Sequence, residues 1–321
     1  MSEATLLEQD FPSKGQADAD PNSIPLEKID VTDSELWVTD KHWGYFERLR
    51  NEAPVHYCAD SEFSGYWSVT TFDHIVEVGK DPETYSSEPT ITVGDIPEDS
   101  ITQNAGFITM DGPRQLAHRK TVAPALGPRN LKRLEPIIRE RVVHILDGLP
   151  IGEEFDWVDR VSIELTTSML AALFDFPYEE QRRLTFWSDI ATTTPNLPGP
   201  DSITLDDRHK ALSECLDVFE GLWKDRKGKG RSGDFVSLLA DGASTHDMPP
   251  RTFLATLVLL IVGGNDTTRN SISGGVLALN QNPAEYDKLR ADPSLIPNMT
   301  SEMIRWQTPL AHMRRTATRD T

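Results

Sequence analysis

The feature that most constrains the fold is the stretch of residues 249–280. Residues 252–262 are apolar on almost every side, so a helix there must be buried on most of its faces. Pro249 and Pro250 suit the first turn of a helix, and Pro283 prevents the helix from continuing. The sequence therefore predicts one helix over residues 249–280, much longer than the usual helix of about 11 residues.

The middle of this helix has an unfavourable composition. Residues 263–268 read Gly-Gly-Asn-Asp-Thr-Thr, and the two glycines alone cost about 1 kcal/mol each relative to alanine. Asp266 adjoins an apolar run, so its carboxylate must be hydrated or paired. Thr267 can donate to the carbonyl of Gly263 and open a local bend. Such a site is suited to hold dioxygen and water and to deliver protons.

A structural interpretation of the same residues stays open at this point. The two glycines, Gly263 and Gly264, would let another helix cross closely. Asp266 would then simply pair with Arg269, three residues along the same helix face, or with another basic residue.

The rest of the chain predicts a mainly α protein with a small β-rich portion. Apolar residues recur at three- and four-residue steps in residues 129–146, 157–173, 179–191 and 206–224, which is typical of amphipathic helices. Two short apolar runs near the N-terminus, from Val55 and from Tyr66, predict a β-hairpin. Residues 1–30 are polar and predict a flexible leader, which leaves residues 31–321 as a single domain.

Composition excludes several kinds of partner. The chain has 321 residues and a formal net charge of −19, which disfavours binding to nucleic acid and to anionic membranes. The longest apolar run, residues 257–262, is far shorter than the roughly 20 residues of a membrane span. The N-terminus also lacks the basic start of a signal peptide. We therefore expect a cytoplasmic protein with no membrane span.

Several motifs resemble one family. Residues 263–268 resemble the oxygen-binding motif of the cytochromes P450, Ala/Gly-Gly-x-Asp/Glu-Thr-Thr/Ser. Glu302 and Arg305 match the family's Glu-x-x-Arg pair, and His-Met-Arg-Arg-Thr-Ala follows at 312–317. Residues 107–120 are similar to the helix that crosses the propionate edge of the heme.

The resemblance extends from about residue 30 to the end. Residues 155–167 and 304–317 are similar to family 153, the soluble bacterial terminal alkane hydroxylases. The resemblance implies the cytochrome P450 fold, heme b as cofactor, and a monooxygenase activity that uses O2. It further implies electrons from NAD(P)H, passed by a ferredoxin reductase to a ferredoxin.

The resemblance also implies roles for individual residues. Asp266 and Thr267 would be catalytic, in proton delivery, and Glu302 with Arg305 would form a buried structural clamp. The residues expected to bind the heme are Gln115, Arg119, Gly263, Gly264 and Arg315. Gln115 stands where the family often has histidine, and its amide can still donate to a carboxylate.

The expected substrate is a medium-chain alkane or fatty acid, hydroxylated at or near the terminal carbon. None of the residues expected in the substrate pocket is charged: Leu259, Val262, Gly263, Leu310 and Met313. Basic residues that would attract an acidic ferredoxin cluster with only two acids among them: Arg114, Arg119, Lys120, Arg129, Lys132, Arg133, Arg139 and Arg141. A solvated helix face explains such a cluster equally well.

One family residue is missing. The family's heme iron is held by a cysteine thiolate in a Gly-rich loop, but Cys58 and Cys215 are the two cysteines here and neither follows a Phe-x-x-Gly motif. We therefore expect no metal ligand in this chain and an incomplete cytochrome P450 domain that stops before the cysteine loop. The alternative function is a truncated, non-catalytic remnant that binds lipophilic ligands without turnover. A terpene cyclase is disfavoured because residues 206–210 lack the third aspartate of its metal motif.

Overall fold

The computed structural model describes residues 15–94, 106–195, 202–230 and 233–321. The chain forms two compact units. The first comprises residues 1–104, 195–203 and 313–321, and the second comprises residues 105–194 and 204–312. Each unit is described by itself, and the predicted single domain over residues 31–321 stays a prediction.

The first unit combines short helices with two small antiparallel sheets. Its helices are η1 (Gln16–Asp18), η2 (Pro21–Ser23), η3 (Leu26–Lys28), α2 (Ser34–Val38), α3 (His42–Glu52) and α4 (Phe72–Lys80). Its strands are β1 (Val55–Cys58), β2 (Tyr66–Val69), β3 (Tyr85–Ser86) and β4 (Thr316–Ala317). The predicted hairpin is confirmed, since β1 pairs with β2 in the register Val55 to Val69.

The described half of the predicted leader is packed in place. Residues 1–14 lie outside the described residues. Ala17 and Ile29 are buried in an apolar cluster with Tyr45, and the Tyr45 hydroxyl donates to the Gln16 carbonyl at 2.7 Å. This differs from the flexible leader expected over residues 1–30, because a few apolar side chains among polar ones are enough to anchor the segment on α2 and α3.

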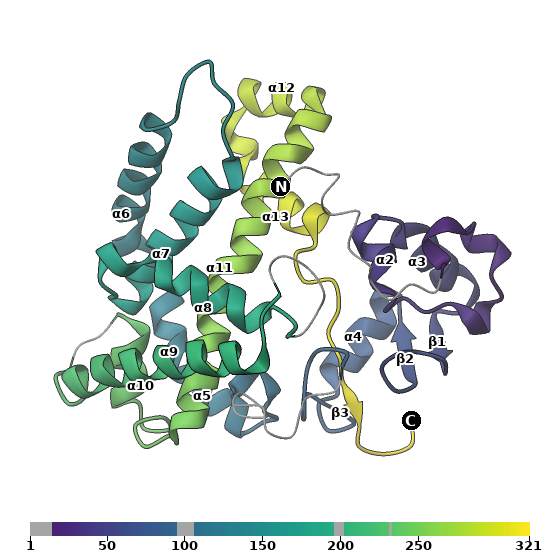
Figure 1. Cartoon of the computed structure of the whole chain (residues 1–321), viewed down its shortest axis with the longest axis horizontal. Coiled ribbons are helices and arrows are strands. Elements are labelled where there is room, and N and C mark those ends of the chain that lie inside the picture. The colour runs from purple at the N-terminus through teal and green to yellow at the C-terminus, as the bar shows by residue number, and fades with distance from the viewer. Residues whose placement is uncertain (1–14, 95–105, 196–201, 231–232) are drawn as a thin grey trace. The chain divides into compact units, whose positions relative to one another are not determined.

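The second unit is helical throughout its described residues (Figure 1). Its α-helices are α5 (Arg114–Val122), α6 (Pro128–Asp147), α7 (Glu164–Phe174), α8 (Arg182–Thr192), α9 (Leu205–Arg226), α10 (Phe235–Asp241), α11 (Pro250–Gln281), α12 (Pro283–Ala291) and α13 (Ile296–Gln307). Shorter helical turns are η4 (Phe107–Thr109), η5 (Ala123–Leu126), η6 (Val158–Ile163), η7 (Tyr178–Glu180) and η8 (Pro293–Leu295). The mainly α fold with a small β-rich portion is therefore confirmed.

Local sequence explains several helix starts. Thr204 and Asp207 form a reciprocal capping box at the start of α9, which satisfies two backbone donors that the helix leaves unpaired. The Asp234 carboxylate accepts from the Ser237 backbone at the start of α10. Asp234 also pairs with the buried Arg226 at 2.9 Å, so one acid caps a helix and neutralises a buried cation.

The core of the second unit contains a cluster of aromatic side chains from α7, α8, α9 and α10. Phe174 lies 5.2 Å from Phe219 and 5.1 Å from Phe235, between ring centroids. The fully buried Trp187 of α8 contacts the same Phe219. Helix α11 packs against α7, α8, α9 and α13 (Figure 1). The residues of α11 are therefore held on several sides, as its apolar composition predicts.

Candidate functional site on the long helix

Helix α11 begins and ends where the sequence predicts. Pro250 occupies its first turn, and the helix runs for 32 residues to Gln281. Phe253, Leu254 and Leu257 are almost fully buried. The helix continues without interruption through residues 263–268, so the expected opening is not a break in the helix.

The predicted threonine contact is present. Thr267 Oγ1 donates to the backbone carbonyl oxygen of Gly263 at 2.8 Å. The hydroxyl thus bonds the preceding turn of its own helix, and its oxygen retains the capacity to accept a further hydrogen bond. Gly263 itself is exposed, and a Cβ added there would have nothing within 4 Å.

Asp266 lies in an ionic cluster that joins α11 to α8. The Arg269 guanidinium donates to the Asp266 carboxylate and, through both terminal nitrogens, to Asp189 Oδ1 at 3.2 Å. The Asp266 and Arg269 side chains are 16% and 17% exposed, so both charges are largely withdrawn from water. Burial raises the pKa of the Asp266 carboxyl, Arg269 opposes that rise, and the second acid, Asp189, adds to it.

The second glycine of the motif has a packing role. A Cβ on Gly264 would lie 2.7 Å from Leu170 Cδ2 of α7. The neighbouring Asn265 is fully buried, and its side-chain oxygen accepts from Thr166 at 2.9 Å. The helix-crossing interpretation of the glycines therefore holds at Gly264, and the pairing of Asp266 with Arg269 is also present.

The predicted propionate face lies on α5. Gln115 and Arg119 are one turn apart, so they share a face of this helix. Arg119 is exposed, and among the described residues its guanidinium has no hydrogen-bonding partner. An exposed arginine with a glutamine beside it fits a carboxylate group such as a heme propionate. His118, on the same helix, is buried, and burial lowers its pKa.

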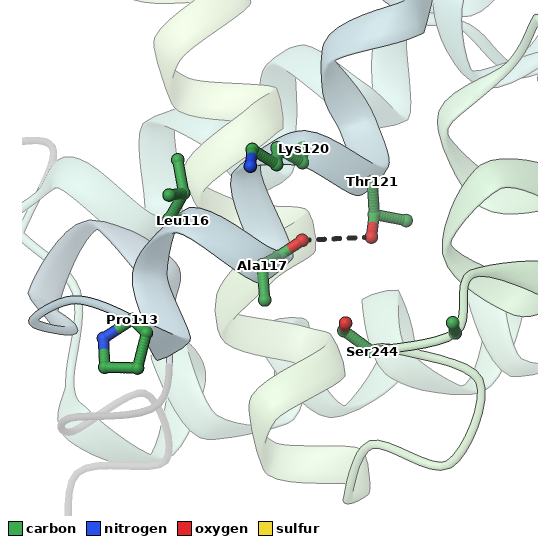
Figure 2. Close-up of a pocket in the computed structure, with 7 residues that line it drawn as sticks. Pro113, Leu116, Ala117, Lys120, Thr121 and Ser244 are labelled. Atoms are coloured by element: carbon green, nitrogen blue, oxygen red, sulfur yellow. Dashed lines mark hydrogen bonds between the residues drawn. The ribbon is translucent and has the colours of Figure 1, made fainter.

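A surface hollow of about 410 Å³ lies on another face of α5 (Figure 2). Figure 2 shows the residues that line it, among them Pro113, Leu116 and Lys120 of this region and Ser244 of the loop after α10. At about 100° per residue, these side chains project well away from the direction of Gln115 and Arg119. The hollow is therefore separate from the predicted propionate face.

The segment around η4 connects α5, which carries the predicted propionate face, with α11. Helix η4 contacts both α5 and α11. Just before it, a Cβ on Gly106 would lie 3.1 Å from the backbone oxygen of Ala255. Gly106 thus allows the chain leading into α5 to press against α11, which fixes the segment that precedes the propionate face.

The Glu-x-x-Arg pair forms as its spacing predicts, but it is not buried. Arg305 donates to both carboxylate oxygens of Glu302, at 2.7 and 2.6 Å. The side chains are 66% and 57% exposed. The expectation of a buried clamp is therefore wrong for the described chain, since an i,i+3 spacing sets which side chains meet and not what covers them.

The remaining predicted residues are divided between the two units. Leu259 and Val262 are half-buried on α11, and Leu310 is exposed just after α13. Met313 and Arg315 belong to the first unit, where Arg315 donates to the backbone oxygen of Arg314 at 2.8 Å. No described cluster of histidine, cysteine or carboxylate side chains would hold a metal ion. Both cysteines are buried, and burial raises the pKa of the Cys215 thiol.

Sequence reasoning missed Asp189. It is 77 positions before Asp266 in the chain, and no local pattern marks it. The only available signal was Asp266 itself, an acid in an apolar helix that requires compensation. The partner expected for Asp266 was Arg269 of the same helix or another basic residue, and neither expectation points to a second acid.

The helical fold carries on α11 the motif whose resemblance implies a heme-binding monooxygenase. Comparison with known proteins gives the family, although no family model matches the chain. A solved cytochrome P450-153 from Novosphingobium aromaticivorans is 46% identical, with a TM-score of 0.83 over 91% of this chain and 73% of its own. Linalool 8-monooxygenase of Pseudomonas putida is 32% identical over 92% of this chain and 75% of its own length. A methyl-branched lipid omega-hydroxylase of Mycobacterium tuberculosis is 26% identical over 94% and 72%.

The chain belongs to the cytochrome P450 family. The resemblance to family 153 is confirmed. Heme b is the cofactor of this family, and NAD(P)H supplies the electrons through redox partners. Among the described residues, no helix is both long and apolar enough to cross a membrane.

Proposed function

We propose that this cytochrome P450 hydroxylates medium-chain alkanes or fatty acids at or near the terminal carbon. The observation that carries the proposal is the 46% identity to a solved family 153 protein. The name of a second relative, an omega-hydroxylase of methyl-branched lipids, supports oxidation at a chain end. The relatives' names span both terpene and lipid substrates, so the choice of an unbranched chain rests on the α11 residues as well.

An apolar stripe on α11 supports that choice. Leu259, Val262 and Gly263 are spaced by three and four residues, which places them on one helix face. None is charged, and an alkyl chain gains about 0.8 kcal/mol for each methylene that it buries. The open space over Gly263 would admit a slender ligand, so Gly263 is our candidate for the position that sets the channel width. Leu310 and Met313 are the further apolar residues assigned to this pocket.

Three side chains would hold heme b by its propionates. Arg119 and the Gln115 amide are both donors on one face of α5, and the family resemblance assigns the same role to Arg315. Gly263 leaves room for a large flat group to approach the α11 backbone. When bound, the heme supplies the oxygen-activating chemistry, and the chain supplies orientation, protons and a dry site.

Asp266 and Thr267 would handle protons. Because burial and Asp189 raise the Asp266 pKa, this carboxyl takes up a proton more readily than an ordinary aspartate does. Thr267 Oγ1, bonded to Gly263, offers a hydroxyl on the next residue. An acid that can be reprotonated from solvent, followed by a fixed hydroxyl, is suited to pass protons into a closed site.

The proton role is tested with Thr267→Ala in the holoenzyme, by which we mean a heme-loaded protein that also contains the family's cysteine loop. Substrate binding should be unchanged, because the hydroxyl is not assigned to the pocket. The share of NAD(P)H electrons that appears in product should fall, with the remainder released as peroxide. An unchanged coupling of NAD(P)H consumption to product would remove Thr267 from the mechanism.

Electrons would come from a ferredoxin and its reductase. Lys120, Arg129 and Lys132 are exposed on α5 and α6. Other members of the cluster have internal partners, since Arg139 pairs with Glu135 at 3.4 Å and Arg141 lies 4.0 Å from the Tyr178 ring. Steering by the exposed cations predicts a reduction rate that falls as salt rises. A rate that does not depend on salt would argue for the solvated-face interpretation.

A second candidate function is binding of lipophilic molecules without turnover by the 321-residue chain. It is favoured by the state of the cysteines, because Cys58 and Cys215 are both buried and a buried thiol in apolar surroundings is a poor source of thiolate. We propose that the 321-residue chain by itself has no monooxygenase activity. After expression with heme, the carbon-monoxide difference spectrum of the reduced protein is expected to lack the thiolate-type band. That band, if present, would refute the proposal.

The substrate proposal is tested by ligand binding to the holoenzyme. Octane and a bulky polycyclic hydrocarbon are titrated separately, and the heme absorbance shift that accompanies displacement of water is measured. We expect saturable binding of octane and much weaker binding of the polycyclic. Tighter binding of the polycyclic would contradict a narrow channel.

A further inference from the structure

One arginine on α11 is shared by two carboxylates from two helices. Arg269 binds Asp266, which lies one turn earlier on the same helix, and it binds Asp189 of α8. The shared atom is Nη2, which donates to both acids. A guanidinium has several donors in a fixed plane, so the position of Arg269 fixes the orientation of both carboxylates at once.

The two acids differ in how much they need the arginine. The Asp266 side chain is 16% exposed, and that of Asp189 is 49% exposed. A half-exposed carboxylate is solvated by water and gains little from an ion pair. A largely buried one depends on its partner, because an unpaired buried charge is costly. Arg269 therefore matters more to Asp266 than to Asp189.

The other charges on neighbouring elements are engaged elsewhere. Arg208 of α9 donates to the backbone oxygens of Ala191 and Thr193. Glu164 of α7 pairs with Arg182. On α13, Glu302 and Arg305 pair with each other. The charges that act on the Asp266 carboxyl are those of Arg269 and Asp189.

We infer that Arg269 is a positioning residue for Asp266, and that Asp189 of α8 weakens this hold by sharing the same guanidinium. Arg269 keeps the Asp266 carboxylate turned toward α8 and favours its ionised form. Asp189 opposes both effects, by its own negative charge and by occupying the Nη atoms. The ion pair between Arg269 and Asp189 thereby links α8 to Asp266, the residue proposed to pass protons. This inference rests on the proposed proton role of Asp266.

Two substitutions should shift the Asp266 titration in opposite directions. Arg269→Gln removes the cation, so the pKa of Asp266 should rise further. Asp189→Asn removes a neighbouring negative charge and releases Arg269 to Asp266 alone, so the pKa should fall. Arg269→Lys retains the charge without the planar fork and should give a smaller rise than Arg269→Gln. A purely structural role would not produce shifts of opposite sign.

The experiment is an infrared titration of the 321-residue chain, without heme. The carboxylic-acid band of Asp266 is isolated by subtracting the spectrum of Asp266→Asn at each pH, in every background. Arg183→Gln is the matched control, because Arg183 also bridges two carboxylates, Glu180 and Glu214, but has no contact with Asp266. The control should leave the Asp266 midpoint unchanged.

The possible outcomes separate the inference from the proposed function. Opposite shifts for Arg269→Gln and Asp189→Asn support the inference, whereas no shift or shifts of the same sign overturn it. Should Arg269→Gln fail to fold, Arg269→Lys and Asp189→Asn still decide the sign. In the holoenzyme, the pH at which product coupling declines should move with the infrared midpoint. If the midpoints shift but coupling does not follow, the proton role of Asp266 fails and the positioning role of Arg269 stands.

Discussion

The two glycines of α11 should respond in opposite ways to the same added methyl group. Alanine in place of glycine gains about 1 kcal/mol in a helix interior, and this gain applies equally to Gly263 and Gly264. At Gly263 the methyl group meets nothing within 4 Å. At Gly264 it lies 2.7 Å from Leu170 Cδ2, and Leu170 is only 1% exposed, so the leucine cannot move into solvent. Overpacking of this kind costs about 1–3 kcal/mol.

We therefore expect Gly263→Ala to raise the free energy of unfolding of the 321-residue chain by about 1 kcal/mol. Gly264→Ala should be less stable than Gly263→Ala by the overpacking cost, about 1–3 kcal/mol. Urea unfolding followed by far-ultraviolet circular dichroism measures both, and the difference between the two variants cancels the helix-propensity gain. Equal midpoints would refute the packing role of Gly264. If Gly264→Ala were also deficient in heme uptake, its predicted place at the cofactor would be supported instead.

Three further expectations follow from the ionic groups. Arg305→Ala should leave the urea midpoint of the 321-residue chain unchanged within error. The Glu302–Arg305 pair is exposed, and exposed pairs contribute little to stability. A marked loss of stability would show that the helix face that carries this pair is covered. Arg226→Ala should lower the free energy of unfolding by about 3–5 kcal/mol, because it removes the partner of the buried Asp234 and the donor to the Phe174 carbonyl. A near-neutral result in the same urea assay would contradict this structural role of Arg226. Because the folded-state pKa of Asp266 is raised above the ordinary aspartate value of 3.8, the folded chain binds more protons there than the unfolded chain, and stability is lost as pH rises through that window. Asp266→Asn should therefore gain stability relative to the parent chain as pH rises from below 3.8, and a difference that does not vary with pH would contradict the raised pKa.

Local patterns predicted most of the fold. Helix α11 was predictable because residues 252–262 are apolar apart from two threonines and the flanking prolines leave few alternatives. The β1–β2 hairpin was predictable from its alternating, aromatic strands. The packing of Gln16 and Ala17 was not, because short turns of 3₁₀ helix carry no periodic signal and their burial depends on α3.

The candidate site was predictable in composition but not in its long-range contacts. Thr267 bonds Gly263 as expected, because both groups belong to one helix turn. The link from Arg269 to Asp189 joins α11 to α8, and nothing in the sequence fixes which faces of two helices meet. The prediction that Glu302 and Arg305 are buried was wrong for the same reason. Their spacing predicts that they pair, but tertiary packing decides what covers the pair.

The position of hydroxylation tests the central claim of terminal oxidation most directly. The holoenzyme is supplied with octane, ferredoxin, reductase and NAD(P)H, and the octanol isomers are separated and quantified. Terminal oxidation requires a narrow channel that keeps the weaker internal C–H bonds away from the heme. We predict that 1-octanol is the main product, and that enlarging the residue at Gly263 to alanine changes the isomer ratio. A product mixture dominated by internal alcohols would contradict the account while leaving the family assignment intact.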